Sequence, residues 1–122
     1  MDKTDLVHWI SKEARYRIIE VLASTRSLKQ LAQELGVSSA AVNKYLSRRM
    51  HPSDQTIARA LEILYDYERE RIYQIIIDDL FNALSKLVDT TCGESEYLRR
   101  YILERLYGLI RRIERGGEGE EG

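Results

Sequence analysis

Residues 38–48 contain small and polar side chains that could form hydrogen bonds with a polar partner surface. If this segment is helical, the period of 3.6 residues separates its side chains into an outward and an inward face. The outward positions are Ser39, Ala40, Asn43, Lys44 and Ser47, and the inward positions are Ala41, Val42, Tyr45 and Leu46. A helix that enters the major groove of DNA needs an outward face without large apolar groups. The segment therefore predicts a surface that binds double-stranded DNA.

Three residues around this segment have the spacing of two helices joined by a tight turn. Ala32 is the small residue needed where the helices cross, and Gly36, four residues later, tolerates the positive φ that the turn requires. Val42, six residues after the glycine, is the buried aliphatic residue of the second helix. Each feature alone is weak, but the three in register are specific. Together they predict a helix-turn-helix from about Ser27 to Arg49.

Serine caps and one proline mark where the helices around this turn begin and end. Ser27 and Gln30 have the spacing of a capping box, and Ser38 and Ser53 are suitable N-caps. Pro52 cannot continue a helix. Apolar residues recur every three or four positions in the segments between these signals. We therefore expect a bundle of four helices at about 11–24 (with an alternative start at Asp5), 28–35, 38–48 and 54–64.

Two long amphipathic helices are expected beyond this bundle, at about 67–90 and from Ser95 onward. Their apolar stripe is too wide for the two helices to bury alone, so it needs a further partner. We favour pairing with the same helices of a second copy, and the alternative is folding back onto the first four helices. The predicted dimerisation residues are Ile72, Ile76, Leu80, Leu84, Leu98, Ile102, Leu106, Leu109 and Ile113.

Composition agrees with an all-α protein of three parts. The 122 residues are 43% hydrophobic and include only one proline, and no long strand-like alternation occurs. We expect a DNA-binding domain at 5–65, a helical dimerisation extension at 66–115 and a disordered acidic tail at 116–122. No segment approaches the length of about 20 apolar residues that a membrane span requires. No secretory signal is recognisable at the N-terminus, and the single cysteine excludes an internal disulfide framework, so we expect a cytoplasmic protein.

Charge is distributed unevenly along the chain, although the net charge is only -1. Residues 1–64 contain ten Lys and Arg against seven Asp and Glu, whereas residues 65–122 contain nine against thirteen. Residues 26–59 contain six basic residues against two acidic ones. Because salt screens charges beyond about 10 Å, the local excess matters more for phosphate attraction than the total. The distribution permits DNA binding by the first half of the chain.

The segment G-V-S-S-A-A-V-N-K-Y-L, residues 36–46, resembles the turn and recognition helix of the Cro-type (XRE-like) phage repressors. The following H-P-S-D-Q-T-I-A-R-A-L is similar to the next helix of that group. The resemblance covers about residues 11–65 and implies a compact helical bundle that binds a palindromic DNA site as a two-fold dimer. It implies nothing about residues 66–122.

By position, the resemblance implies that five residues face the base edges: Ser38, Ser39, Ala40, Asn43 and Lys44. It also implies phosphate contacts near Ser27, Lys29, Ser47, Arg48 and Arg49. Basic residues at a helix C-terminus are stabilising without DNA, so Arg48 and Arg49 have this alternative explanation. Tyr45 stands where the family usually has an aliphatic residue, so it could shift the helix outward or offer its hydroxyl to a phosphate.

The sequence thus predicts a homodimeric, sequence-specific transcriptional regulator with its recognition helix at about 38–48 in the major groove. The pattern lacks a nucleophile beside a base, a phosphate-binding glycine loop and metal-ligand spacing, so we expect no enzymatic activity, cofactor or metal. Two alternatives stay open. One is a helical protein-protein interaction adaptor that docks a partner through the C-terminal helices, and the other is an antitoxin-type repressor.

Overall fold

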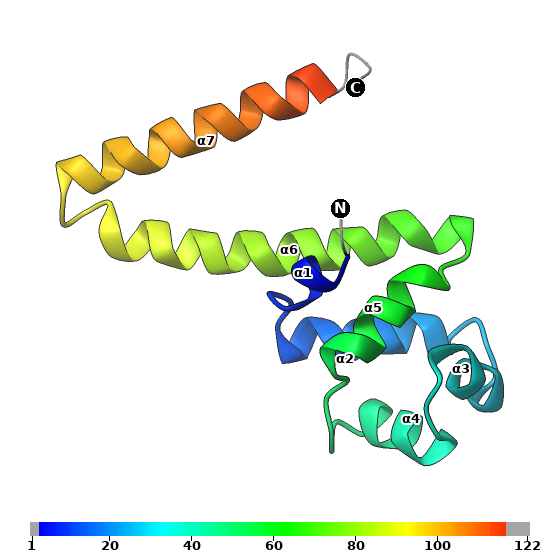
Figure 1. The fold of residues 1–122 in the computed structure, drawn as a ribbon. Coiled ribbons are helices and arrows are strands. Elements are labelled where there is room, and N and C mark those ends of the chain that lie inside the picture. Colours follow the sequence, from blue (N-terminus) through cyan, green and yellow to red (C-terminus); the bar gives the residue numbers. More distant parts are fainter. Residues whose placement is uncertain (1–2, 117–122) are drawn as a thin grey trace. The chain divides into compact units, whose positions relative to one another are not determined.

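The computed structural model describes residues 3–116, and side chains from Asp5 onward. Within this range it contains helices and no strand, so the prediction of an all-α fold is confirmed (Figure 1). The predicted acidic tail, residues 116–122, lies outside the described residues except for Gly116. The helices are α1 (Lys3–Val7), α2 (Lys12–Ala23), α3 (Leu28–Leu35), α4 (Ser39–Leu46), α5 (Asp54–Glu62), α6 (Asp66–Thr91) and α7 (Glu96–Gly116).

Serine side chains cap the helices around the turn, as the sequence predicts. The hydroxyl oxygens of Ser27, Ser38 and Ser53 accept hydrogen bonds from the backbone amides three residues later, at 3.0, 3.0 and 3.1 Å. Each capping residue has an extended backbone, which leaves its side chain free to reach back over the first turn. These bonds depend on neighbouring residues only, which explains why the helix starts could be predicted.

The N-terminal segment forms two helices rather than one. Turn bonds from Trp9 N to Leu6 O and from Ile10 N to Val7 O, both 3.1 Å, end α1. Ser11 then caps α2, so the longer helix with a start at Asp5 does not form. This break directs Val7 and Ile10 into the core, where both are buried.

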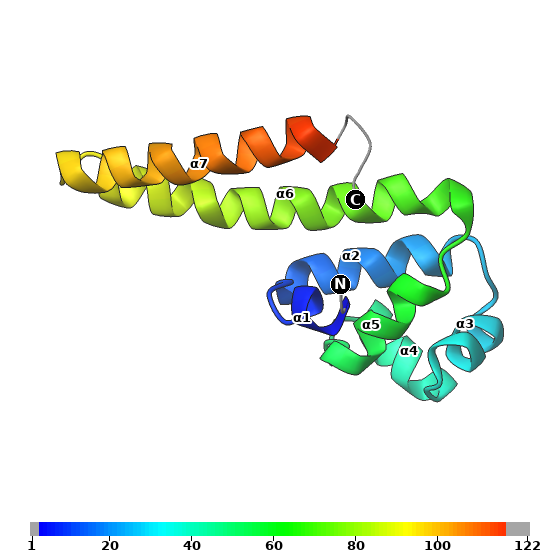
Figure 2. The ribbon, with the colours of Figure 1, turned by 45° about the horizontal axis from the view of Figure 1, so that its top comes forward.

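The first of two compact units comprises Met1–Phe81 and has one core built from α1 to α5 and the first part of α6. Its largest fully buried side chains include Ile18, Leu31, Val42 and Ile57 from the four predicted helices. Helix α6 adds Ile72, Ile75 and Ile76 to this core. The unit therefore ends later than the predicted DNA-binding domain, 5–65, because these isoleucines complete its core. Figures 1 and 2 show α2 lying between α4 and the first part of α6.

The second compact unit, Asn82–Gly122, contains the last part of α6 and all of α7 among its described residues. The chain turns between the two helices, and Ser95 caps α7 by accepting a hydrogen bond from the Leu98 amide at 3.1 Å. A groove between the helices is lined by apolar side chains that include Leu84, Leu98 and Leu106. No described residue of α7 is buried, so this unit leaves most of its apolar stripe exposed.

Candidate nucleic-acid interface

The turn between α3 and α4 has the geometry that its three key residues predict. Gly36 adopts the left-handed conformation, with φ 73° and ψ 32°. Ala32 is 4% exposed and Val42 is fully buried, as expected for the crossing point and the inward face. The Val37 amide donates a hydrogen bond to the Ala32 carbonyl at 3.0 Å, which closes the end of α3. A side chain at position 36 would strain this backbone, so glycine is needed here.

Helix α4 presents the predicted outward face. The side chains of Ser39, Ala40, Asn43 and Lys44 are exposed. Tyr45 is 4% exposed and lies in the core, so its hydroxyl is not offered to a phosphate. The aromatic ring is thus accommodated inside the bundle in place of the aliphatic residue that is usual in the resembling family.

The N-termini of α3 and α4 add partial positive charge to the candidate interface. Ser38 is exposed while it caps α4, and Ser27 is exposed while it caps α3. Unpaired backbone amides in the first turn of a helix, together with the helix dipole, attract anions such as phosphate. Lys29, in the first turn of α3, is also exposed.

Arg48, one of the predicted phosphate contacts, pairs with carboxylates of α2. The helix ends at Leu46, two residues before the predicted end, and Arg48 then has a positive φ of 62°. Its guanidinium donates to Glu13 Oε1 at 2.6 Å and to Glu20 Oε2 at 3.4 Å. The hydrogen bond from Arg48 lowers the pKa of Glu13 below its ordinary value. The charge of Arg48 is therefore paired with α2 in the free protein, unlike the charges of Lys29 and Arg49.

Arg49 and Ser47 remain next to the outward face. Arg49 Nε donates a hydrogen bond to Ser47 Oγ at 2.9 Å, and both side chains are exposed. Among residues 5–116, Arg49, Lys29 and Lys44 have no carboxylate within the 4.0 Å of an ion pair. These three side chains carry the positive charge around α3 and α4 that is not paired with a carboxylate.

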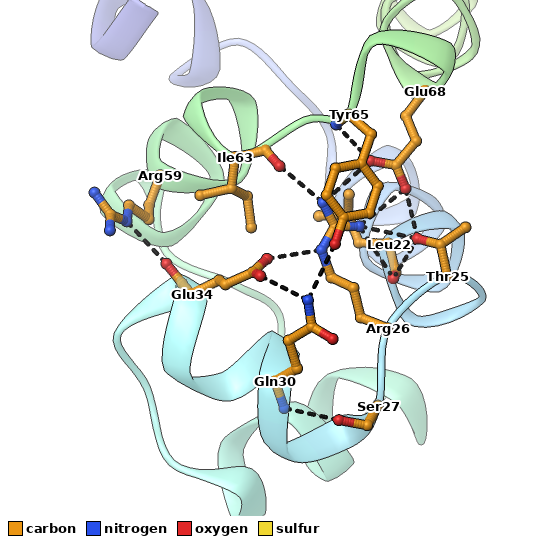
Figure 3. A network of polar contacts seen from close by, with 10 residues as sticks. All are labelled: Leu22, Thr25, Arg26, Ser27, Gln30, Glu34, Arg59, Ile63, Tyr65 and Glu68. Atoms are coloured by element: carbon orange, nitrogen blue, oxygen red, sulfur yellow. Dashed lines mark hydrogen bonds and ion pairs between the residues drawn. The ribbon is translucent and has the colours of Figure 1, made fainter.

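Arg26, another cation of the basic segment, is buried behind α3 in a network of polar contacts (Figure 3). Its Nε donates to Glu34 Oε1 at 2.7 Å, and its Nη1 donates to Glu68 Oε2 at 2.9 Å. Its Nη2 donates to the Ile63 carbonyl at 2.7 Å, and the Tyr65 ring lies 3.9 Å from the guanidinium carbon. One side chain therefore joins the end of α2, α3, the end of α5 and the first turn of α6.

Glu68 and Arg15 are further positioning residues that sequence reasoning missed. Glu68 Oε1 accepts a hydrogen bond from the Tyr65 amide at 2.9 Å, a local contact that an i, i+3 pattern could have suggested. Arg15 is buried, and it donates to the carbonyls of Val7 at 2.7 Å and Pro52 at 3.0 Å. Pro52 is 37 residues from Arg15 and Glu68 is 42 residues from Arg26, so sequence spacing could not have indicated these two contacts.

Comparisons with known proteins agree with this geometry. Residues 20–64 match the protein-family model described as Helix-turn-helix. No curated protein and no solved structure gives a significant match. No helix in the described part of the chain is long and apolar enough to cross a membrane. The side chains described also contain no group of three or more His, Cys, Asp or Glu placed to hold a metal ion.

Proposed function

We propose that the chain is a sequence-specific, homodimeric transcriptional regulator, because residues 20–64 match the family model described as Helix-turn-helix and residues 36–46 resemble the recognition helix of the Cro-type repressors. Helix α4 lies in the major groove of double-stranded DNA in this proposal. The observation that carries it is the exposed polar face of α4, placed by the Gly36 turn on a buried Ala32 and Val42. This face has no large apolar group, and a groove can therefore accept it.

Base reading is assigned to the exposed face of α4 and its N-cap. The Asn43 amide can make paired hydrogen bonds to adenine N6 and N7, and the Lys44 ammonium can donate to guanine N7 or O6. The Ser39 hydroxyl and the Ala40 methyl are short, so they let the N-terminal half of α4 approach the base edges. Ser38 lies at the end of the helix that faces the bases in helix-turn-helix complexes.

Phosphate contacts are assigned to the residues on either side of this face. Ser27 and Lys29 lie at the N-terminus of α3, and Ser47 and Arg49 follow α4. Lys29 and Arg49 have no paired carboxylate among the described residues, so their charges are available to phosphates. Such contacts position the protein on the duplex but carry little sequence information.

We expect Asn43→Ala and Lys44→Ala to relax base preference at the positions that each side chain contacts. The loss of a specific base contact is worth about 1–3 kcal/mol in discrimination. The measurement is selection of a random-sequence duplex library by purified wild type and variants. Lys29→Ala is the matched control, because loss of a phosphate contact lowers affinity for all sequences and reduces the salt dependence of binding. If both alanine variants of α4 select the same sequences as wild type, α4 is not the reading helix.

Homodimerisation is assigned to the apolar stripe of the second compact unit. Leu98, Leu109 and Ile113 are exposed, and Ile113 is 66% exposed, which is costly for apolar groups in contact with water. Leu84, Ile102 and Leu106 are half-buried on the same helices, and Leu80 is half-buried just before them on α6. Ile72 and Ile76 are left out of this interface because the core of the first unit already covers them. The same stripe of a second copy would cover the remaining apolar residues and remove them from water.

The double variant Leu109→Glu/Ile113→Glu is expected to be monomeric, because four charges would enter the interface of the dimer. Sedimentation equilibrium of wild type and variant measures the change. Arg111→Glu, on the opposite face of α7, is the matched control and should remain dimeric. A monomeric wild type would contradict the proposed dimer and leave the stripe to a different protein partner, as in an adaptor or an antitoxin.

A further inference from the structure

A cleft of about 340 Å³ opens in the first compact unit between α2 and the first part of α6. Its α2 wall includes Arg17 and Val21, and its α6 wall includes Tyr67, Arg71 and Ile75. The volume is within the range of pockets that hold small organic molecules, at its lower end. The DNA-binding function proposed above uses none of these residues.

The two arginines of the cleft have no ion-pair partner within 4.0 Å among the described side chains. Arg17 and Arg71 are exposed, and neither has a hydrogen bond or ion pair with any other described side chain. Glu20 and Glu68 also line the cleft, but their charges are engaged elsewhere. Glu20 contacts Arg48 at 3.4 Å, and Glu68 contacts the buried guanidinium described above at 2.9 Å. The cleft therefore has two guanidinium groups available to an anion.

The rest of the lining is apolar and aromatic. Ile75, which is buried, and Val21, which is half-buried, both line the cleft. Tyr67 is 70% exposed at the cleft, with its ring 5.7 Å from the Tyr65 ring in a stacked arrangement. An inorganic anion would leave these apolar surfaces in contact with water. A ligand with an apolar body and one anionic end would cover them and reach the arginines as well.

The residues that line the cleft are different from those assigned to the proposed DNA surface. Helix α2 lies between α4 and the first part of α6 in both views of the ribbon (Figures 1 and 2). The lining of the cleft contains residues of α2 and α6 and of the segment that follows α2, and it includes no residue of α3 or α4.

We propose that this cleft binds a small organic carboxylate with an aromatic or aliphatic body, held by Arg17 and Arg71. Guanidinium groups bind carboxylates with paired, charge-assisted hydrogen bonds, and Ile75, Val21 and Tyr67 contact the body of the ligand. Ligand binding joins α2 to α6 and stabilises the first unit according to ligand concentration. The proposal does not require DNA binding, so the two can fail separately.

The test is an NMR titration of the full chain with benzoate and hexanoate as probes. We expect saturable shifts of the backbone amides of Val21, Thr25 and Ile75 with at least one of these carboxylates. Benzamide has the shape of benzoate without its charge and should bind at least ten times more weakly. Inorganic phosphate has the charge without the apolar body and should also bind more weakly.

Variants assign the binding to the cleft. Arg17→Ala/Arg71→Ala should weaken carboxylate binding at least tenfold while the spectrum of the folded protein is retained, because neither side chain has a structural partner among the described residues. Arg69→Ala, two residues from Arg71 and outside the cleft lining, is the matched control and should bind as wild type does. The proposal is overturned if neither carboxylate gives a saturable response, if the double variant binds as wild type does, or if phosphate binds as tightly as benzoate.

Discussion

Glu68→Gln is expected to lower the free energy of unfolding by about 3 kcal/mol, although Glu68 lies outside the helix-turn-helix itself. Removing one partner of a buried ion pair typically costs about 3–5 kcal/mol, because the remaining charge stays buried without compensation. Arg26 keeps its second partner, Glu34, at 2.7 Å, so we expect a loss at the lower end of this range. The measurement is equilibrium unfolding in urea, at neutral pH.

Glu70→Gln is the matched control for this variant. Glu70 is on the same helix and is exposed, so its replacement should change the free energy of unfolding by less than about 0.5 kcal/mol. Equal losses for the two variants would show that the network around Arg26 does not hold the first turn of α6 to the bundle.

The difference in the free energy of unfolding between wild type and Glu68→Gln should depend on pH. Burial by itself raises the pKa of Glu68, but hydrogen bonds from Arg26, Thr25 and the Tyr65 amide outweigh it, so the pKa lies below its ordinary value of 4.5. A carboxyl group whose pKa is lower in the folded than in the unfolded state stabilises the fold at pH values above its unfolded pKa. This contribution is lost as the pH falls through the folded pKa. The difference should therefore be constant near neutral pH and shrink below about pH 4.5. A difference that grows on acidification would contradict the ion pair.

Ile72→Ala is expected to cost about 2–5 kcal/mol in the free energy of unfolding, because it leaves a cavity in the core of the first unit. Ile72 is fully buried. Ile77→Ala, on the same helix with 51% exposure, is the control and should have little effect. Urea unfolding of both variants checks this. If Ile72→Ala were neutral in the folded chain yet abolished dimerisation, Ile72 would belong to the interface that the sequence predicted.

Truncation of the chain tests the same role of α6 in the core and should lower the free energy of unfolding more than Ile72→Ala does. A fragment that ends at residue 65 loses Ile72, Ile75 and Ile76, each worth about 1.5–3 kcal/mol of burial. It also loses the bond from the Ser11 amide to Asp79 Oδ2 at 2.9 Å. Domains of this size are stable by only about 5–15 kcal/mol, so this fragment should not fold, whereas one that ends at residue 81 should. Circular dichroism measures whether each fragment is helical, and thermal unfolding measures whether it unfolds cooperatively.

The sequence by itself determined the local features of this protein. The serine caps of α3, α4 and α5, the glycine turn and the exposed polar face of α4 follow from contacts within a few residues. Hydrogen bonds of this kind need only residues three or four positions apart in the chain. The positions of the helices and the helix-turn-helix could therefore be predicted without knowledge of the packing.

Only the tertiary structure decided which charged and apolar groups are available to partners. Arg26 and Arg48 are basic in sequence like Lys44, but carboxylates far along the chain pair with the two arginines: Glu68 is 42 residues from Arg26 and Glu13 is 35 from Arg48. Likewise, periodicity shows that α6 has an apolar stripe but not what covers it. The first part of the stripe completes a core and the last part remains exposed, because burial depends on neighbours that only the folded chain brings together.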